Sequence, residues 1–498
     1  MRTIDQLGVF WLVTHPDEKL SGRLRFDPSG DNVRLTIVGR FVEDDEAEDE
    51  TDIAIHGWAG GDPVTVDGAY RNGGSSRSRG VDETHYRANR IFVGRHLAPD
   101  DLHFETAHLE LSDLNGWVGT TGLMPDRESS AEDVIYHISY RKPPSQEGTF
   151  SRGRVRISFG PEFVAEAGNQ VNLREHLRFH LYYDAAQQVD SIRRDVGRLQ
   201  ALIILCSGSS TVLDELLLSR SDVKATMLDG SVSRFDELIE LCASPVNYVA
   251  EAERKPAQAH DVLISYDELG GIEAVARWID ESTVFERPLD YLTSIMMARH
   301  MYAENRFLNV TYAAEAYHRI TVGGSRKNDT EFQQAMTACL ESAPAEFQSW
   351  LAEQLRHNNE PTLRRRLQQL ANAVAPADRS IIADRSRWAY LTATTRNEIT
   401  HIGDRYRDIE GSDLVLLAQS VYDVVRLNML KQSGVEIDIL ATKSQIYPFA
   451  WYQARLAAGL DRIRRVFESK PAETSRGVLV TPLLSASGDS GQRPEELP

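Results

Sequence analysis

The sequence predicts an α+β multidomain protein, with a β-rich, sandwich-like front region that includes one helix and an all-α helical bundle behind it. Up to about residue 180, short β-branched runs alternate with turn residues. From about residue 289, apolar residues recur three and four positions apart in nearly every segment. The 498 residues suffice for two to four domains. We place the front region at 1–284, the helical domain at 285–466 and a disordered tail at 467–498.

The front strands are predicted from short runs between turn signals. RLRFD (23–27) and VRLTIVGRF (33–41) are separated by DPSGDN, which is rich in turn-forming residues. Many short strands with regular turns favour a sandwich or barrel over a βαβ sheet. The acidic run EDDEAEDETD (43–52) is expected to be a solvated loop, because such dense like charges cannot pack. Further strands are predicted at 52–58, 64–70, 90–96, 108–114, 154–160 and 176–184.

The pattern changes near residue 185. Between Val189 and Ile203 the apolar residues are spaced by three and four, which indicates a helix. NYVA (247–250) and DVLISYDEL (261–269) resemble strands that return to the front region. The domain boundary is placed at ESTVFERP (281–288), where Pro288 can open a new helix.

The helical domain is predicted from a series of amphipathic segments. The first, residues 289–320, is long and contains neither Gly nor Pro. Shorter helices follow it, separated by Gly and Pro residues. A helix at 386–403 ends at Gly403. A helix at 412–434 starts with Ser412 as its N-cap and carries a broad apolar face, as expected in the core of a bundle.

Composition excludes several classes of protein. No window of about 18 uncharged apolar residues is present, so a membrane span is not expected, and the first residues lack the apolar core of a signal peptide. Cys206, Cys242 and Cys339 are too few and too scattered for a disulfide framework or a thiolate zinc site. We therefore expect a cytoplasmic protein with no metal and no cofactor.

The distribution of charge keeps nucleic acid open as a partner. The net charge of −19 argues against phosphate binding, which requires Lys and Arg. Residues 1–284 carry −19, residues 285–470 carry +2 and residues 471–498 carry −2. The acidity thus belongs to the front region, and the helical domain has local Arg clusters.

The most informative segment is TTRNEITHIGDRYR (394–407). On a helix, Asn397 and His401 share a face, whereas Arg396 lies about 140° from His401 and must reach round the edge. Imidazole can move a proton between the 2′-hydroxyl and the leaving oxygen of RNA, while guanidinium stabilises charge on the phosphate. The 2′-hydroxyl is then the nucleophile, so the chemistry needs no metal.

The spacing R-x-x-x-x-H by itself is weak, because a surface Arg with a histidine at a helix end occurs by chance in many proteins. Its context is stronger. The motif closes a helix in an all-α domain and is followed by Arg405, Tyr406 and Arg407, which could offer RNA an aromatic ring between two cations.

With these residues the helical domain resembles the HEPN superfamily, whose ribonucleases carry R-x-x-x-x-H at the mouth of a helical bundle. More narrowly, it resembles the ApeA-like HEPN proteins of bacterial anti-phage defence. The similarity rests on four segments and on a β-rich front region like that of the family, and it covers roughly residues 1–465. The segments are RFLNVTYAAEAYHR (306–319), TLRRRLQQL (362–370), RNEITH (396–401) and LKQSGV (430–435).

The resemblance implies an RNA endonuclease that acts as a homodimer, with two motif helices facing each other across one composite cleft. It makes Arg396 and His401 catalytic and gives Asn397 the role of orienting the histidine or the phosphate. The products would be 2′,3′-cyclic phosphate and 5′-hydroxyl ends. Members of the family act as toxins in abortive infection, and transfer RNA is a common target. The acidic front region would sense a phage-derived protein.

Other groups have simpler interpretations. Arg364–Arg366 is more often a solvated helix face than an RNA track. Glu315, His318 and Arg319 are expected to brace the bundle. His176 and His180 alternate onto one face of a strand, where partial exposure explains them without a metal.

Two other functions are open. In the first, a non-catalytic dimer uses the helical domain only for dimerisation, and the front region binds a ligand or protein. In the second, the front region is a carbohydrate- or peptide-binding sandwich. We rank this last, because Trp11, Trp58 and Trp117 are scattered in the sequence and form no clear aromatic platform.

Overall fold

The structure is a computed structural model of the chain. Two predicted segments, the acidic loop 43–52 and NYVA (247–250), lie outside the described residues. So does nearly all of the predicted tail, although the last helix extends to Glu468 and thus two residues into it. The residues described are 1–29, 33–41, 53–75, 80–129, 134–166, 170–226, 231–243, 262–298, 300–356, 358–446 and 449–469.

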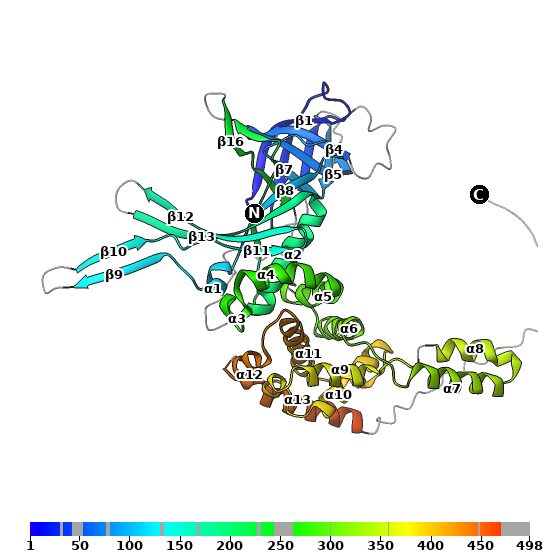
Figure 1. Cartoon of the computed structure of the whole chain (residues 1–498). Helices are drawn as coiled ribbons and strands as arrows, with labels where there is room; N and C mark the ends of the chain where they lie inside the picture. The colour runs from blue at the N-terminus through cyan, green and yellow to red at the C-terminus, as the bar shows by residue number, and fades with distance from the viewer. Residues whose placement is uncertain are drawn as a thin grey trace, which may run out of the picture.

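A closed barrel forms the front of the molecule (Figure 1). Six antiparallel strands pair in a ring, which is closed by the pairing of β5 with β6. Inward residues such as Phe10, Leu24 and Ile55 fill the barrel with their own hydrophobic core. The strands are β1 (Ile4–Leu12), β2 (Leu20–Phe26), β3 (Val33–Val38), β4 (Ile53–Ala59), β5 (Asp62–Ser75) and β6 (Glu83–Ala88).

The sheet continues beyond the barrel. Strand β7 pairs with β5 of the barrel, and from there the sheet runs in the order β7-β17-β14-β8-β13-β12-β11. The helix predicted near residue 189 is α2 (Val189–Ser207), most of which is buried between this part of the sheet and the helices α4 (Gly271–Glu281) and α5 (Glu286–Met297). The strands are β7 (Arg90–Val93), β8 (His103–Leu111), β11 (Gln146–Phe150), β12 (Gly153–Glu166), β13 (Gln170–Gln188), β14 (Leu213–Ser219) and β17 (Ile239–Ala243).

Two hairpins project from the sheet in the same direction (Figure 1). One is the far end of β12 and β13, and the other is β9 (Leu123–Ser129) with β10 (Val134–Tyr140). The short helix α1 (Leu114–Val118) precedes β9, and β15 (Lys224–Thr226) pairs with β16 (Val232–Asp236) in a separate ribbon. The strands predicted before residue 185 that lie in the described residues are present. The sequence analysis missed β1, along which burial does not alternate, and it also named no strand at β6, β9–β11 or β14–β17.

One predicted strand is wrong. Within DVLISYDEL the chain forms the helical turn α3 (Tyr266–Leu269), which leads into α4 (Gly271–Glu281). Ser265 caps α3: its hydroxyl accepts from the Glu268 amide, and the Glu268 carboxylate accepts from the Ser265 amide. This capping box is a helix signal that the apolar run concealed.

The region from α5 onward is helical, as predicted (Figure 1). The segment expected to form one long helix is two, because the backbone is extended at Ala298 and Tyr302; neither Gly nor Pro marks this break. The helices are α5 (Glu286–Met297), α6 (Ala303–Thr321), α7 (Asp329–Ser342), α8 (Ala345–Leu355), α9 (Leu363–Ala373), α10 (Arg385–Thr400), α11 (Gly411–Gln432), α12 (Ile437–Ile446) and α13 (Phe449–Glu468).

A second hydrophobic core joins the sheet beyond the barrel to the helices. It extends without a break from Phe104 in β8 through α2 to Leu427 in α11. Arg426 of α11 is buried, and its guanidinium donates to the Leu205 and Cys206 carbonyls at the end of α2. The domain boundary at residues 284 and 285 therefore remains a prediction, since this core crosses it.

Candidate functional site

Helix α10 carries the predicted motif and is anchored at its beginning. Asp384 caps it, with its carboxylate accepting from the Arg387 amide. Trp388 is buried and donates from Nε1 to the Ser420 hydroxyl of α11 at 2.8 Å. Arg387 pairs with Asp461 of α13. These contacts fix the helix axis, so the position of its C-terminal turn is determined by the bundle.

The C-terminal turn of α10 presents His401. His401 is the C-cap residue, with its amide donating to the Asn397 carbonyl at 2.9 Å. Ile402 then adopts φ = 54°, an unfavourable conformation for a β-branched residue. Gly403 follows because a Cβ there would lie 2.1 Å from the Glu398 carboxylate. The chain reverses at once after the histidine, which leaves His401 exposed at the surface.

Arg396 is half-buried beside this turn. One guanidinium nitrogen donates to Asn397 Oδ1 at 3.3 Å, and another lies 3.6 Å from Glu315 Oε2 on α6. Arg396 thus reaches round the helix toward Asn397, as the geometry of the motif predicts. Glu315 restrains the guanidinium without covering it.

Glu315 belongs to a chain of charged groups that joins α6 to α9. It pairs with Arg319 at 3.1 Å, and Arg319 pairs with Glu360 at 3.0 Å. Glu360 also accepts from Arg366 at 2.8 Å. Three of the segments that carry the HEPN resemblance, at AYHR, TLRRR and RNEITH, therefore meet around Arg396.

His318 lies at the centre of this network and is fully buried. Arg366 donates to its Nδ1 at 3.2 Å, so the proton is on Nε2, which donates to Gln369 Oε1 at 2.8 Å. Burial lowers the pKa of His318, and the Arg366 charge lowers it further against the opposing contact with Gln369. Both ring nitrogens of His318 therefore have a hydrogen-bond partner, and the ring is neutral.

The three consecutive arginines Arg364–Arg366 differ in exposure, because they lie on different sides of α9. Arg366 is buried and also donates from Nε to the Pro361 carbonyl, so the solvated face expected for this run holds for only two of its members. Arg364 and Arg365 are exposed. The Arg364 guanidinium lies over the ring of exposed Tyr390 on α10, 5.3 Å from its centroid.

The candidate RNA-binding residues lie in η6 (Arg405–Asp408), directly after the turn. Arg405 donates to the Phe467 carbonyl at the end of α13, which directs its guanidinium toward the bundle. Tyr406 is half-buried, and Arg407 is exposed. Arg407 is thus the most accessible cation of the three.

The exposed side of α10 is a feature that sequence reasoning missed. The four exposed residues of this helix are uncharged and lie within an arc of about 80° that leads to His401. The helical spacing of these residues was the available signal. They are Ser386, Tyr390, Asn397 and Thr400.

In the front region, the structure brings together aromatic residues that are scattered in the sequence. Trp11 and half-exposed Trp58 both contact the His96 ring edge-on, at centroid distances of 5.2 and 5.4 Å. His56 stacks on the other side at 4.8 Å. Trp11 and Trp58 therefore meet despite their separation in the sequence, but Trp11 and Trp117 are buried, so the three do not form an exposed aromatic platform.

The strand histidines are paired. His176 contacts Glu110 at 2.7 Å and Glu162 at 2.6 Å. His180 contacts His108 at 2.5 Å and Ser158 at 2.6 Å. Among the described residues, no group of three or more His, Cys, Asp or Glu side chains is arranged to hold a metal ion.

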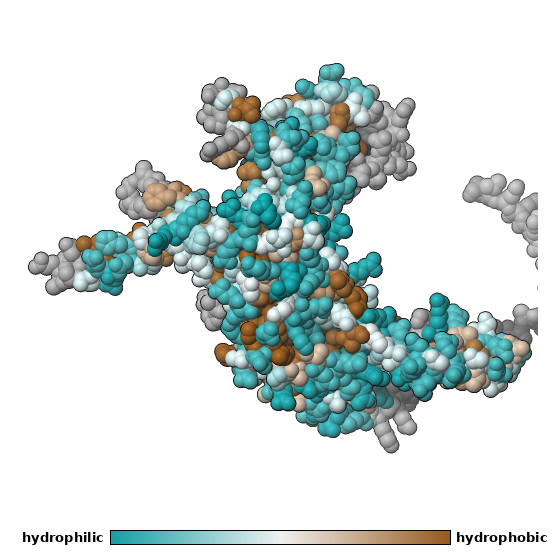
Figure 2. Space-filling model, viewed as in Figure 1, coloured by the Kyte–Doolittle hydropathy of each residue, from teal (hydrophilic) through white to brown (hydrophobic). Residues whose placement is uncertain are grey.

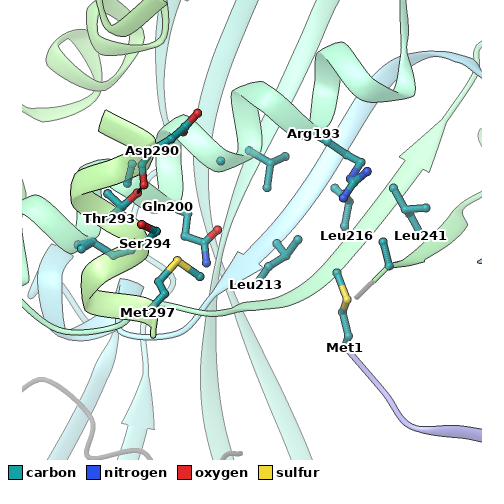
Figure 3. Close-up of a pocket in the computed structure, with 15 residues that line it drawn as sticks. Met1, Arg193, Gln200, Leu213, Leu216, Leu241, Asp290, Thr293, Ser294 and Met297 are labelled. Atoms are coloured by element: carbon teal, nitrogen blue, oxygen red, sulfur yellow. Dashed lines mark hydrogen bonds between the residues drawn. The ribbon is translucent and has the colours of Figure 1, made fainter. Parts of the chain in front are cut away.

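A cavity of about 330 Å³ lies where the front region meets the first helix of the helical domain (Figure 3). Arg193, Leu216 and Leu241 lie on one side of it, and Asp290, Thr293 and Met297 of α5 lie on the other. Gly197, in the middle of α2, also lines it, and no atom lies within 4 Å of the position of a Cβ there. The volume is at the lower end of the range for small-molecule sites.

The fold and the site define a two-part class of protein, a β-rich front region joined to a helical bundle with an Arg–His motif at a helix end. The family model described as ApeA N-terminal domain 1 matches residues 6–278, and that described as Apea-like HEPN matches residues 308–438. The chain belongs to the ApeA-like HEPN family. Comparison with curated proteins and with solved structures gave no match.

The family assignment makes this a HEPN-type protein of the RNase-like defence class. HEPN domains often dimerise and bind RNA. No helix among the described residues is long and apolar enough to cross a membrane.

Proposed function

We propose that this protein is a metal-independent RNA endonuclease that cuts transfer RNA or other host RNA during anti-phage abortive infection in the cytoplasm. One observation carries the proposal: His401 is exposed at the C-terminal end of α10, and the Arg396 side chain, five residues earlier, is restrained by Glu315 but remains one-third exposed. A titratable base next to an oriented cation is the minimum equipment for cleaving RNA through its own 2′-hydroxyl.

In the proposed reaction, the His401 imidazole accepts the proton of the 2′-hydroxyl, and the oxygen attacks the adjacent phosphorus. The bond from phosphorus to the 5′-oxygen breaks, and that oxygen takes a proton from imidazolium. Arg396 stabilises the negative charge on the phosphate, and Asn397 orients the phosphate or the histidine. The products carry 2′,3′-cyclic phosphate and 5′-hydroxyl ends, and no cofactor takes part.

We propose that the active form is a homodimer built on the C-terminal part of the uncharged ridge of α10, at Asn397 and Thr400. Residues 394–410 contain three Arg but four acidic residues, so one copy cannot concentrate positive charge at the motif. Two ridges packed together would place two Arg396 and two His401 side chains at one cleft. Packing this ridge buries no charge, and its hydroxyl and amide groups would exchange water for hydrogen bonds across the interface.

The front region fits the role of a sensor. Its charge of −19 repels RNA and suits a protein trigger of phage origin. The cavity between α2 and α5 lies on the path from this region to the site, because α5 packs on α6, which carries Glu315. The alternative function, a ligand-binding sensor with a non-catalytic helical dimer, is favoured by the same cavity. It gives Arg396 and His401 no role.

The test is incubation of the purified protein with total transfer RNA in EDTA, followed by a denaturing gel and analysis of the fragment ends. Wild-type protein should give discrete fragments with cyclic phosphate ends. His401→Ala and Arg396→Ala should give none, while His300→Ala, a change at another exposed histidine of the helical region, should cleave like wild type. Cleavage by His401→Ala would contradict the proposal, and a dimer without cleavage in the presence of the trigger would favour the alternative.

A further inference from the structure

Helices α7 and α8 form an arm, residues 329–355, that projects from the bundle (Figure 1). They pack on each other, and none of their residues, all of which are described, is buried. Isolated helices of 11 to 14 residues are marginal in water. The arm therefore lacks the tertiary packing that stabilises the other helices.

The surface of the arm is acidic and aromatic. Residues 328–355 contain five carboxylates and no Lys, Arg or His, although the helical domain as a whole is nearly neutral. Phe347 and Trp350 are 52% and 59% exposed. Trp350 has Glu346 one turn before it and Glu353 one turn after it, on the same face of α8. In Figure 2 the arm is largely hydrophilic, with apolar patches between polar ones.

This chemistry excludes RNA as the occupant, because carboxylates repel phosphates. It is complementary to the surface formed by α9 and α10 of the same protein. There, Arg364 and Arg365 are exposed, with no carboxylate partner among the described residues, and the exposed ring of Tyr390 lies beneath Arg364. A cation over an aromatic ring, with a second exposed cation next to it in the sequence, is complementary to a ring flanked by two carboxylates.

The base of the arm is rigid and connected to the site. The Asn359 side chain accepts from the Lys327 amide at 2.9 Å and donates to the Lys327 carbonyl and the Asp329 carboxylate. The next residue is Glu360, which holds Arg319 and Arg366 in the network that reaches Arg396. A contact made by the arm is thus linked mechanically to the catalytic motif.

We propose that the arm docks on a second copy of this chain, with the Glu346–Trp350–Glu353 face of α8 against Arg364, Arg365 and Tyr390 of that copy. The inference rests on the proposed homodimer and deepens it. At 1.5 Å per residue the arm extends about 20 Å. By two-fold symmetry both arms make the contact, so the dimer is clasped beside the α10 ridge.

The native cysteines provide the test. Of the three, Cys206 and Cys242 are buried, and Cys339 is exposed on α7. Full-length protein labelled at Cys339 with a benzophenone maleimide is irradiated, and the products are separated by mass and mapped by mass spectrometry. We expect a product of twice the chain mass that joins the arm to α9 or α10 of the second copy. Cross-links only within one chain, or to another part of the second copy, would overturn the proposal.

Charge variants sharpen the result. Arg364→Glu with Arg365→Glu should reduce the yield of the cross-linked dimer at least about tenfold, and Glu346→Lys with Glu353→Lys in the same chain should restore it. Arg287→Glu, on the exposed side of α5, is the control and should leave the yield unchanged. The cross-link and the cleavage assay test the two proposals separately. If the wild-type protein cleaves RNA but gives no cross-linked dimer, only the arm contact is rejected. If it gives the cross-linked dimer but does not cleave RNA, only the nuclease is rejected.

Discussion

The histidines of the sheet and those of the helical bundle differ in what their ring nitrogens contact. In the sheet, both nitrogens of His176 face carboxylates, and those of His180 face Ser158 and His108. In the bundle, His318 is held in the same way by Arg366 and Gln369, whereas the His401 ring has no hydrogen-bond partner among the described residues. A ring held on both nitrogens acts as a structural link. At least one ring nitrogen must be available, as in His401, for a histidine to take a proton from a substrate.

The largest effect expected from this difference is at His401. His401→Ala should lower the rate of RNA cleavage at least about 1,000-fold, because it removes the group that moves the proton. The melting temperature and the dimer should be unchanged, since the side chain is exposed. Kinetics on a defined transfer RNA and a thermal melt measure the two. A fall in stability equal to the loss of activity would place His401 among the structural histidines.

The sheet histidines should make stability depend on pH. Burial lowers the pKa of His108 to about 4 from its ordinary 6.5, and Arg178 contributes to the shift. The unfolded chain then binds more protons between these values, so stability is lost as the pH falls from 6.5 to 4. His108→Asn should remove up to about 3 kcal/mol of this loss, as measured by urea unfolding at each pH.

The pKa of His176 is shifted in the opposite direction to that of His108, so His176 serves as the control. Its contacts with Glu110 and Glu162 outweigh burial and raise its pKa. Its stabilising effect is present below pH 6.5 and is lost as the pH rises through the raised value. His176→Asn should therefore steepen the acid loss. If both variants changed the pH dependence in the same direction, the assignment of these two roles would be wrong.

His318 should behave as a structural residue within the nuclease domain. His318→Ala leaves Arg366 and Gln369 without their buried partner and should lower the free energy of unfolding by about 2 kcal/mol. Residual activity should persist in the folded fraction, measured below the melting temperature. Complete loss of cleavage with unchanged stability would instead place His318 in the chemistry.

The smallest expected effect concerns Glu315. Glu315→Gln keeps the shape of the side chain but removes the charge that restrains Arg396, so kcat should fall about tenfold while KM changes little. Its ion pair with Arg319 is half-exposed, so unfolding should change by less than about 1 kcal/mol. Cleavage equal to that of wild type would show that Arg396 needs no restraint.

Much of the fold was predictable because local patterns determine it. Alternating runs between turn residues located the strands from Leu20 to Val38, and apolar spacing located α2 and α10. Local signals were also misread. Ser412 lies inside α11, whose N-cap is Glu410, because the preceding backbone rather than the hydroxyl sets the start of that helix. The capping box at Ser265 was hidden by an apolar run.

By itself, the sequence determined the class of fold, the Arg396–Asn397–His401 motif and the family resemblance, since each depends on residues close together in the chain. Only the tertiary structure decided which charged groups are available. Glu315 meets Arg396 across 81 positions of sequence, and Arg366 is buried while Arg364 and Arg365 are not. The closure of the barrel through β5 and β6 and the meeting of Trp11 with Trp58 around His96 were decided in the same way. Such contacts depend on how distant elements pack, and no local pattern encodes them.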